Sequence, residues 1–133
     1  MNYVFNEYGI QQMKAIGEAL APLGVDLPEP EDQIVVVLGE GPLDEEDRAE
    51  FERALVEGPE EYRVALALQT DVYRAEGEIF VHGAITSRER AEGKTSEELE
   101  QALTLHAMMG TVTLQAIPKR YLTPVAGTAE AEA

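Results

Sequence analysis

Residues 34–38, Ile-Val-Val-Val-Leu, are five consecutive apolar residues, and the first four of them are β-branched. β-Branched side chains favour strands, and a short unbroken apolar run indicates a strand that is buried on both faces or lies centrally in a sheet. We therefore expect the rest of the fold to be arranged around this strand.

A helix is predicted before this strand. Asn6 is a suitable N-cap, and apolar residues then recur at helical spacing up to about Ala21, where Pro22 and Gly24 end the pattern. The stripe contains Ile10, Met13, Ile16, Gly17 and Leu20. Residues 25–32, Val-Asp-Leu-Pro-Glu-Pro-Glu-Asp, form a proline-rich acidic connector without periodicity.

A second helix is predicted after the strand. Gly39-Glu-Gly-Pro42 is expected to turn the chain, and the helix extends from about Asp44 to Glu57, where Gly58 and Pro59 stop it. Its first turn is Asp-Glu-Glu-Asp, which suits the positive end of a helix dipole. Its apolar face is narrow (Phe51, Ala54 and Leu55), so we expect it on the outside of the domain.

Residues 62–74 alternate between apolar and more polar side chains, which predicts a strand. A short loop with Gly77 at positive φ leads to a second strand, residues 78–86, with Ile79, Val81 and Ile85 on one face and His82 on the other. Together the two strands would form a long β-hairpin with an edge open to strand addition.

The last predicted helix follows a charged loop, residues 87–94. Thr95 and Glu98 have the spacing of a capping box, and the helix that they open continues to Gly110. Its apolar stripe contains Leu99, Ala102, Leu103, His106 and Met109. A final strand is expected over residues 111–117, with Val112 and Leu114 pointing inward.

The elements predict an α+β domain in the order α-β-α-β-β-α-β. We expect a four-stranded sheet, mostly antiparallel or mixed, with about three helices on one face. Residues 1–123 would form this single domain, and residues 124–133 a flexible acidic tail.

The composition limits the class of function. The chain has no cysteine, so disulfides and thiolate chemistry are excluded, and neither a secretory signal nor a membrane-spanning run is visible. Its net charge of −16 argues against direct binding of nucleic-acid phosphates or of an anionic membrane. We expect a protein of the cytoplasm, or one assembled into a virion.

The charge is unevenly distributed. Residues 29–61 hold 13 acidic and 2 basic side chains, a net charge of −11, whereas residues 62–133 hold 10 acidic and 7 basic ones. Five of these seven bases form two small groups, Arg88, Arg90 and Lys94 in the charged loop, and Lys119 with Arg120. A subunit with one acidic side and one locally basic side can associate head to tail, and such contacts close into rings or stack into tubes.

Three kinds of chemistry receive weak support. The Gly39-x-Gly41 turn resembles a phosphate-binding loop, but the carboxylates that follow would repel an anion. Glu40, Asp44, Glu45 and Asp47 could hold Mg²⁺ or Ca²⁺ but lack an alternating calcium-loop spacing. The two histidines are more simply explained by structural roles, His106 as a core or half-buried residue, and neither Ser87 nor Ser96 lies in a nucleophile motif.

Part of the chain resembles a known family. Val64-Ala-Leu-Ala-Leu-Gln-Thr-Asp-Val-Tyr-Arg-Ala-Glu-Gly77, a hairpin return, Ser96-Glu-Glu-Leu-Glu-Gln-Ala-Leu103 and a final strand resemble the small α+β tail-terminator and head–tail joining proteins of tailed phages. The likeness covers about residues 62–117. It implies a hexameric ring at the neck or the tail end of a phage particle.

The sequence therefore favours a non-enzymatic structural or protein-interaction subunit without a cofactor, forming a homo-oligomeric ring. The residues expected to make the contacts are Glu45, Glu46, Glu50, Glu57, Arg88, Arg90, Lys119 and Arg120. An acidic regulator that binds a basic surface of a nucleic-acid enzyme is the alternative, with the acidic span as its contact. A small enzyme or ligand-binding domain is a third possibility and would need a pocket.

Overall fold

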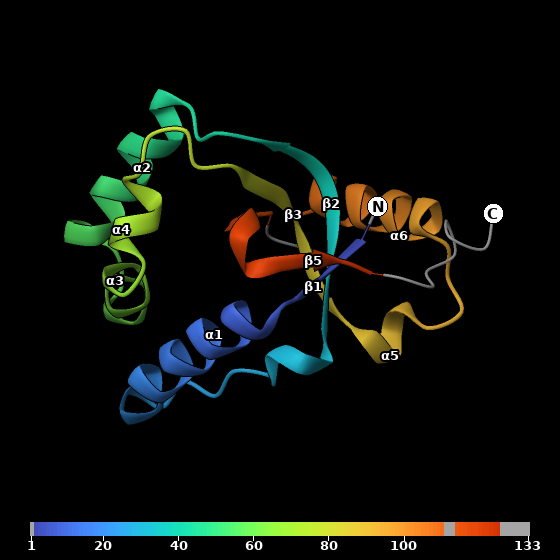
Figure 1. Cartoon of the computed structure of the whole chain (residues 1–133), viewed down its shortest axis with the longest axis horizontal. Coiled ribbons are helices and arrows are strands. Elements are labelled where there is room, and N and C mark those ends of the chain that lie inside the picture. The colour runs from blue at the N-terminus through green and yellow to red at the C-terminus, as the bar shows by residue number, and fades with distance from the viewer. Residues whose placement is uncertain (1, 111–113, 126–133) are drawn as a thin grey trace.

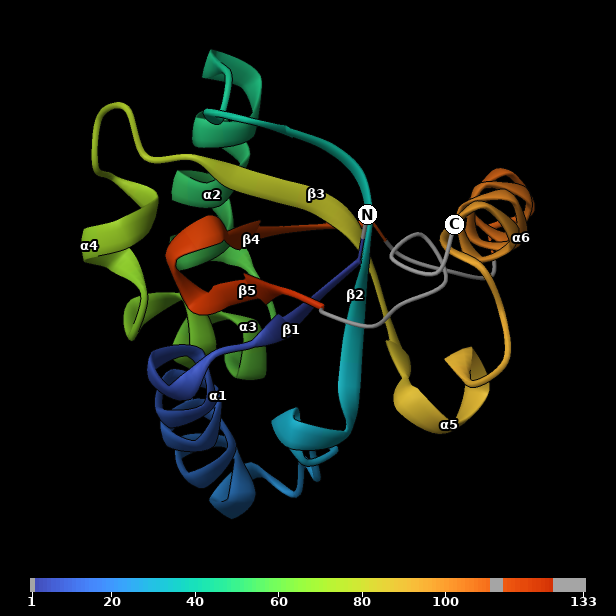
Figure 2. The ribbon, with the colours of Figure 1, turned by 45° about the vertical axis from the view of Figure 1, so that its right-hand side comes forward.

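The computed structural model describes residues 2–110 and 114–125, and it is an α+β fold built on a five-stranded sheet (Figures 1 and 2). The strands are ordered β4-β3-β2-β1-β5, and all neighbours are antiparallel. The strands are β1 (Asn2–Phe5), β2 (Gln33–Gly41), β3 (Phe80–Ser87), β4 (Gln115–Pro118) and β5 (Leu122–Pro124). The helices are α1 (Glu7–Leu20), α2 (Glu45–Glu57), α3 (Glu60–Ala67), α4 (Thr70–Tyr73), α5 (Arg88–Ala91) and α6 (Ser96–Met108), with 3-10 turns η1 (Ala21–Leu23), η2 (Pro30–Asp32) and η3 (Lys119–Tyr121).

The predicted apolar strand is the middle strand of the sheet. It extends to Gly41, three residues beyond the apolar run, and pairs along its length with β3. The register shifts between Val37 and Gly39, so Leu38 is the extra residue of a β-bulge. The Gly-x-Gly segment that resembled a phosphate loop therefore lies inside β2, opposite residues 80–82.

Helices cover both faces of the sheet, which corrects the expectation of one covered face. Ile10 and Met13 of α1 pack with Phe5 and Val35 in the larger core cluster. Residues of α5 and α6 pack on the other face in a smaller cluster of Val36, Ala91 and Leu99, with Ile34 and Leu103 at its margin. Successive residues of a strand point to opposite faces, so Val35 and Val36 belong to different cores.

Helix α1 begins where Asn6 caps it. The side-chain oxygen of Asn6 accepts a hydrogen bond from Gly9 N (2.8 Å), while its amide nitrogen donates to Arg120 O (2.9 Å). The backbone of Gly9 lies directly against η3, and a Cβ atom at this position would overlap the carbonyl oxygen of Tyr121. The first turn of α1 is thus fixed to the C-terminal part of the domain.

The predicted strand over residues 62–74 is wrong, and with it the long hairpin and its open edge. Helices α3 and α4 occupy this stretch. Tyr73 of α4 stacks on Phe51 of α2 (ring centroids 5.0 Å apart) and contacts Phe80 of β3. This aromatic stack attaches α2 and α4 to the sheet, and burial raises the pKa of Tyr73.

The other elements differ from the predictions in detail. Helices α1, α2 and α6 lie where they were expected. Thr95 caps α6 as predicted, because its Oγ1 atom accepts a hydrogen bond from Glu98 N (3.0 Å). Strands β1 and β5 were not predicted, and the charged loop contains α5. Leu114, expected to point inward, is exposed and precedes β4; residues 111–113, including Val112, lie outside the described residues. Helix α2 ends at Gly58 with φ −69°, whereas Gly77 has the expected positive φ.

The C-terminal boundary was placed at residue 123. Strand β5 continues to Pro124, and Val125 N donates to Asn2 O (3.0 Å). The remaining residues of the predicted tail, 126–133, lie outside the described residues.

Candidate functional site

One end of the molecule is acidic, and α2 forms it. Asp44 caps this helix by accepting from Asp47 N (2.7 Å), so part of the acidic cluster has a structural role. Glu46, Glu50 and Glu57 recur at spacings of four and seven residues, which puts them on one helix face. We call Glu45, Glu46, Glu50 and Glu57, together with Glu60 and Glu61 of α3, the acidic end.

The opposite end of the molecule, residues 88–108, carries three bases among five glutamates, so it is less acidic than α2 and α3 and only locally basic. Ser87 caps the short helix α5 by accepting from Arg90 N (3.2 Å), and this turn exposes Arg88 and Arg90. Lys94 follows after Gly93 and is also exposed. Within the part of the chain that the structure describes, no ion pair joins these three side chains to a carboxylate. We call Arg88, Arg90 and Lys94 the basic end.

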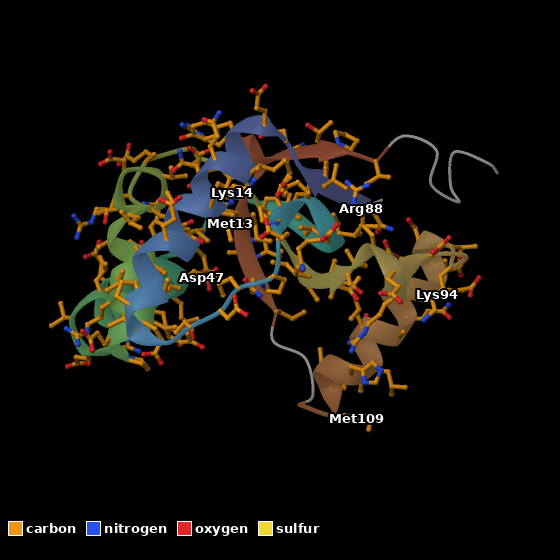
Figure 3. All side chains as sticks on the ribbon, turned by 90° about the horizontal axis from the view of Figure 1, so that it is seen from below. Met13, Lys14, Asp47, Arg88, Lys94 and Met109 are labelled. Carbon is orange, nitrogen blue, oxygen red and sulfur yellow. The ribbon has the colours of Figure 1, made fainter. Side chains whose placement is uncertain are left out.

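The two ends are separated along the longest axis of the molecule. Helices α2, α3 and α4 lie on the left of Figures 1 and 2, and α5 and α6 lie on the right. In the view from below, Asp47 and Lys94 also lie on opposite sides (Figure 3). The charge asymmetry of the sequence is therefore also an asymmetry in space.

The second predicted basic pair belongs to neither end, because internal carboxylates neutralise it. Lys119 Nζ lies 3.0 Å from Glu40 Oε2, and Arg120 Nη2 lies 2.5 Å from Glu78 Oε1. The Glu78 side chain is 8 % exposed, so Arg120 balances a nearly buried charge. Lys119 and Arg120 are thus the candidate contact residues least available to a partner.

Glu40 also binds a core tyrosine. The Tyr3 hydroxyl donates to Glu40 Oε1 (2.5 Å). This hydrogen bond, and then the one from Lys119, hold the pKa of Glu40 below its usual value, and the same contact with Glu40 raises the pKa of Tyr3. The arrangement links β1, β2 and η3 and is a structural network rather than a reactive one.

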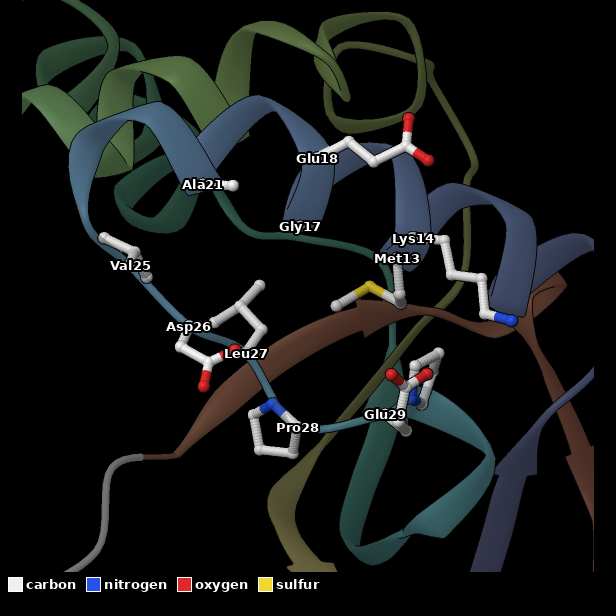
Figure 4. A pocket seen from close by; sticks show the side chains of 11 residues that line it. Met13, Lys14, Gly17, Glu18, Ala21, Val25, Asp26, Leu27, Pro28 and Glu29 are labelled. Carbon is white, nitrogen blue, oxygen red and sulfur yellow. The ribbon is translucent and has the colours of Figure 1, made fainter.

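Several clefts lie among the described residues, including one of about 300 Å³ lined by Phe5, Met13, Pro30 and Ile85 that has no charged side chain. A cleft of about 360 Å³ between β3, α5 and α6 has a floor of apolar side chains and a rim that includes Arg90, Lys94 and His106. Another, of about 460 Å³, lies between β2 and α6, where Leu105 and Met108 are exposed. A cleft of about 390 Å³ lies between α1 and the proline-rich connector, with Met13 and Leu27 pointing toward its interior (Figure 4).

This last cleft shows no reactive arrangement. The charged side chains that line it are Lys14, Glu18, Asp26 and Glu29, and it contains neither histidine nor serine. Lys14 Nζ is already paired with Glu31 Oε2 at 3.1 Å. The cleft therefore offers an apolar groove with an acidic border.

The candidate catalytic residues do not form a site. Ser87 is a helix cap, Ser96 is buried in α6, and His82 lies half-buried in β3 opposite Gly39 and Ala116. His106 was expected in or near the core but is exposed on α6. Among the described residues, no cluster of three or more histidine, aspartate or glutamate side chains could hold a metal ion, and no helix is long and apolar enough to cross a membrane.

Comparisons with known proteins add no relative, because no protein-family model, curated protein or solved structure gives a significant match to the chain. Function is therefore inferred from the surfaces of the molecule itself.

Sequence analysis did not anticipate the exposed apolar side chains at the end of α6, and its placement of Met109 on the buried stripe of that helix is wrong. Leu105, Met108 and Met109 are 56 %, 81 % and 64 % exposed. The available signal was that α6 carries more apolar residues than one stripe of a surface helix needs. Large exposed apolar side chains next to a cleft are typical of a protein contact surface.

Proposed function

We propose that this protein is a non-enzymatic protein-interaction subunit that assembles with copies of itself head to tail. The single observation that carries the proposal is the placement of the acidic and basic ends at opposite ends of the long axis. Such a subunit presents a different surface at each end, so each copy can bind the next, and the series closes into a ring if the rotation permits.

The internal ion pairs support this reading. Lys14, Arg74, Lys119 and Arg120 each have a carboxylate partner within the chain. The other six bases have none among the described residues, and Arg88, Arg90 and Lys94 are three of these six, although the chain has 26 acidic and 10 basic residues. Unpaired cations on so acidic a protein suit a carboxylate supplied by another subunit.

A ring of this kind is also what the resemblance to phage tail-terminator and head–tail joining proteins implies. The proposal therefore includes a place in a phage neck or tail as the setting of the ring. Assembly into a purified particle, seen as a ring of this protein at the neck or tail end, would support that setting.

The test is the native mass at two salt concentrations. We expect multi-angle light scattering to show a mass above that of the 14.6 kDa monomer at tens of micromolar protein in low salt. In 1 M NaCl the mass should fall, because the Debye length shrinks from about 8 Å at physiological ionic strength to about 3 Å. A monomeric mass up to high micromolar concentration in low salt would refute the proposal.

A second candidate function rests on the glutamates of α2. In the described part of the chain, Glu46, Glu50 and Glu57 take part in no ion pair, so this helix could instead bind a basic surface of another protein, as an acidic regulator would. Binding of a basic enzyme by the monomer, lost on the charge reversal Glu46→Lys/Glu50→Lys, would favour the regulator.

A further inference from the structure

The cleft between β3, α5 and α6 combines an apolar floor with a cationic rim. Its floor comes from Ile85 of β3 and from the α6 residues Leu99 and Leu103. Arg90, Lys94 and His106 line the same cleft, and the rim also includes the half-buried Thr86. The cleft contains no carboxylate among its lining residues.

The residues that line this cleft indicate which side chains a bound segment should present. An apolar side chain of the bound segment would pack on the floor of the cleft and so be removed from water. A carboxylate next to it in the same segment would pair with the guanidinium of Arg90 or the ammonium of Lys94. A short segment that presents apolar and acidic side chains together is therefore the best fit.

The corner between α2 and α3 is such a segment, and it lies at the other end of the molecule. Val56 is 77 % exposed and Tyr62 is 62 % exposed, which places both among the most exposed large apolar side chains of the described residues. Glu57 and Glu60 lie between them in the sequence and are exposed. Gly58 and Pro59 join the two helices into a tight corner.

The other clefts fit this corner less well. The cleft between β2 and α6 is lined by Glu100 and by no base. The cleft under α1 contains Glu18, Asp26 and Glu29, and its one base, Lys14, is paired with Glu31. Like charges would repel an acidic corner from both, and the uncharged cleft lined by Phe5, Met13 and Ile85 offers its carboxylates no cation, so charge favours the cleft beside α5.

We infer that the cleft between β3, α5 and α6 binds the α2–α3 corner of a second copy of this chain. Val56 or Tyr62 of one copy enters the apolar floor of the next, and Glu57 and Glu60 face Arg90 and Lys94. This inference rests on the proposed head-to-tail assembly and names the two surfaces that meet.

Charge reversal tests the cleft directly. Arg90→Glu/Lys94→Glu should weaken self-association at least tenfold in sedimentation velocity, with the circular dichroism spectrum and melting temperature of the wild type. The variant with Glu57→Lys and Glu60→Lys should show an equally weakened self-association when it is studied alone. An equimolar mixture of the two chains should recover association, because the reversed cleft meets a reversed corner.

Arg88→Glu is the matched control. It changes the net charge as much as Arg90→Glu on the same helix, but Arg88 does not line the cleft. We expect Arg88→Glu to weaken association clearly less than Arg90→Glu. Equal effects of the two substitutions would overturn the assignment of the cleft.

Cysteine cross-linking gives an independent readout, because the natural chain has no cysteine. Tyr62→Cys and Lys94→Cys are made on separate chains and mixed under mild oxidation. The inference expects disulfide heterodimers to dominate over both homodimers. If homodimers of the Tyr62→Cys chain dominate instead, the contact is symmetric and the inference is overturned.

The two proposals fail in distinguishable ways. If the wild type is a monomer, head-to-tail assembly and this inference fall together. If the wild type assembles but the reversal of Arg90 and Lys94 leaves its association unchanged, the inference falls while the proposed assembly remains.

Discussion

Gly9 lies in the first turn of α1, and we predict that its replacement by alanine destabilises the protein. From helix propensity alone, Gly9→Ala should stabilise a helix interior by up to about 1 kcal/mol. The structure predicts the opposite sign, because the new Cβ atom would overlap Tyr121 O and lie 3.0 Å from Tyr121 Cβ.

The carbonyl of Tyr121 cannot easily move away. It accepts a hydrogen bond from Asn6 N (2.9 Å), and Asn6 also binds Arg120 O. Overpacking costs roughly 1–3 kcal/mol, and the loss of one hydrogen bond adds about 1 kcal/mol. After the gain in helix propensity is subtracted, the free energy of unfolding should fall by about 2 kcal/mol.

The assay is thermal unfolding followed by circular dichroism. The entropy of unfolding is about 2.1 cal/mol/K per residue, or about 0.28 kcal/mol/K for 133 residues. A loss of about 2 kcal/mol should then lower the melting temperature by about 7 °C.

Gly17→Ala is the matched control in the same helix, since a Cβ atom there meets nothing within 4 Å. It should raise the free energy of unfolding by about 0.5–1 kcal/mol. If Gly9→Ala is as stable as the wild type, or if both substitutions shift the melting temperature alike, the close approach of α1 to η3 is wrong.

Three further predictions concern the hydrogen bonds of Glu40, the Thr95 cap of α6 and the stack of Phe51 on Tyr73. Glu40→Gln should lower the free energy of unfolding at pH 7, and this difference from the wild type should vanish on acidification. The pKa of Glu40 is lower in the folded than in the unfolded protein, so its carboxylate stabilises the fold above the unfolded-state pKa. That stabilisation is lost as the pH falls through the folded-state pKa. Urea unfolding from pH 7 to about pH 3 measures this, and a difference that does not change with pH would contradict it. Thr95→Ala should cost about 1 kcal/mol by removing the α6 cap, whereas Thr95→Ser should cost less; melting curves of the two variants decide. Phe51→Ala should cost roughly 3–5 kcal/mol because Phe51 is buried and stacks on Tyr73; a loss below about 1 kcal/mol in urea unfolding would show that α2 is not held by this contact.

Elements with their own local signals could be predicted from the sequence. Asn6 and Thr95 are caps that act within three residues, and the apolar run of β2 is long enough to indicate its place in the sheet. Strands β1 and β5 have four and three residues, too few to show periodicity, and they are defined by their pairing with each other.

The stretch 62–74 shows why alternation can mislead. Tyr62, Val64, Leu66 and Leu68 repeat every second residue, but the intervening residues are helix formers. Glu60 and Glu61 in the first turn of α3 favour the helix through its dipole, and Tyr73 completes the stack on Phe51. Local propensity and tertiary packing together outweighed a pattern that spans only a few residues.

The candidate surfaces could be predicted only in part. The sequence shows that acidic and basic residues form separate groups along the chain. Only the three-dimensional structure shows that these groups also lie far apart in space. The sequence could not show that Lys119 and Arg120 are neutralised, because their partners Glu40 and Glu78 lie 79 and 42 residues away along the chain.

The position of β1 between β2 and β5 has a consequence for synthesis on the ribosome. Tyr3 pairs with Val35 on one side and with Pro124 on the other, so the two neighbours of this strand are translated far apart in time. Until residues 122–124 emerge, β1 offers an unpaired edge to other nascent chains. The interval between the synthesis of β1 and that of β5 is therefore one in which this edge is open to misassembly.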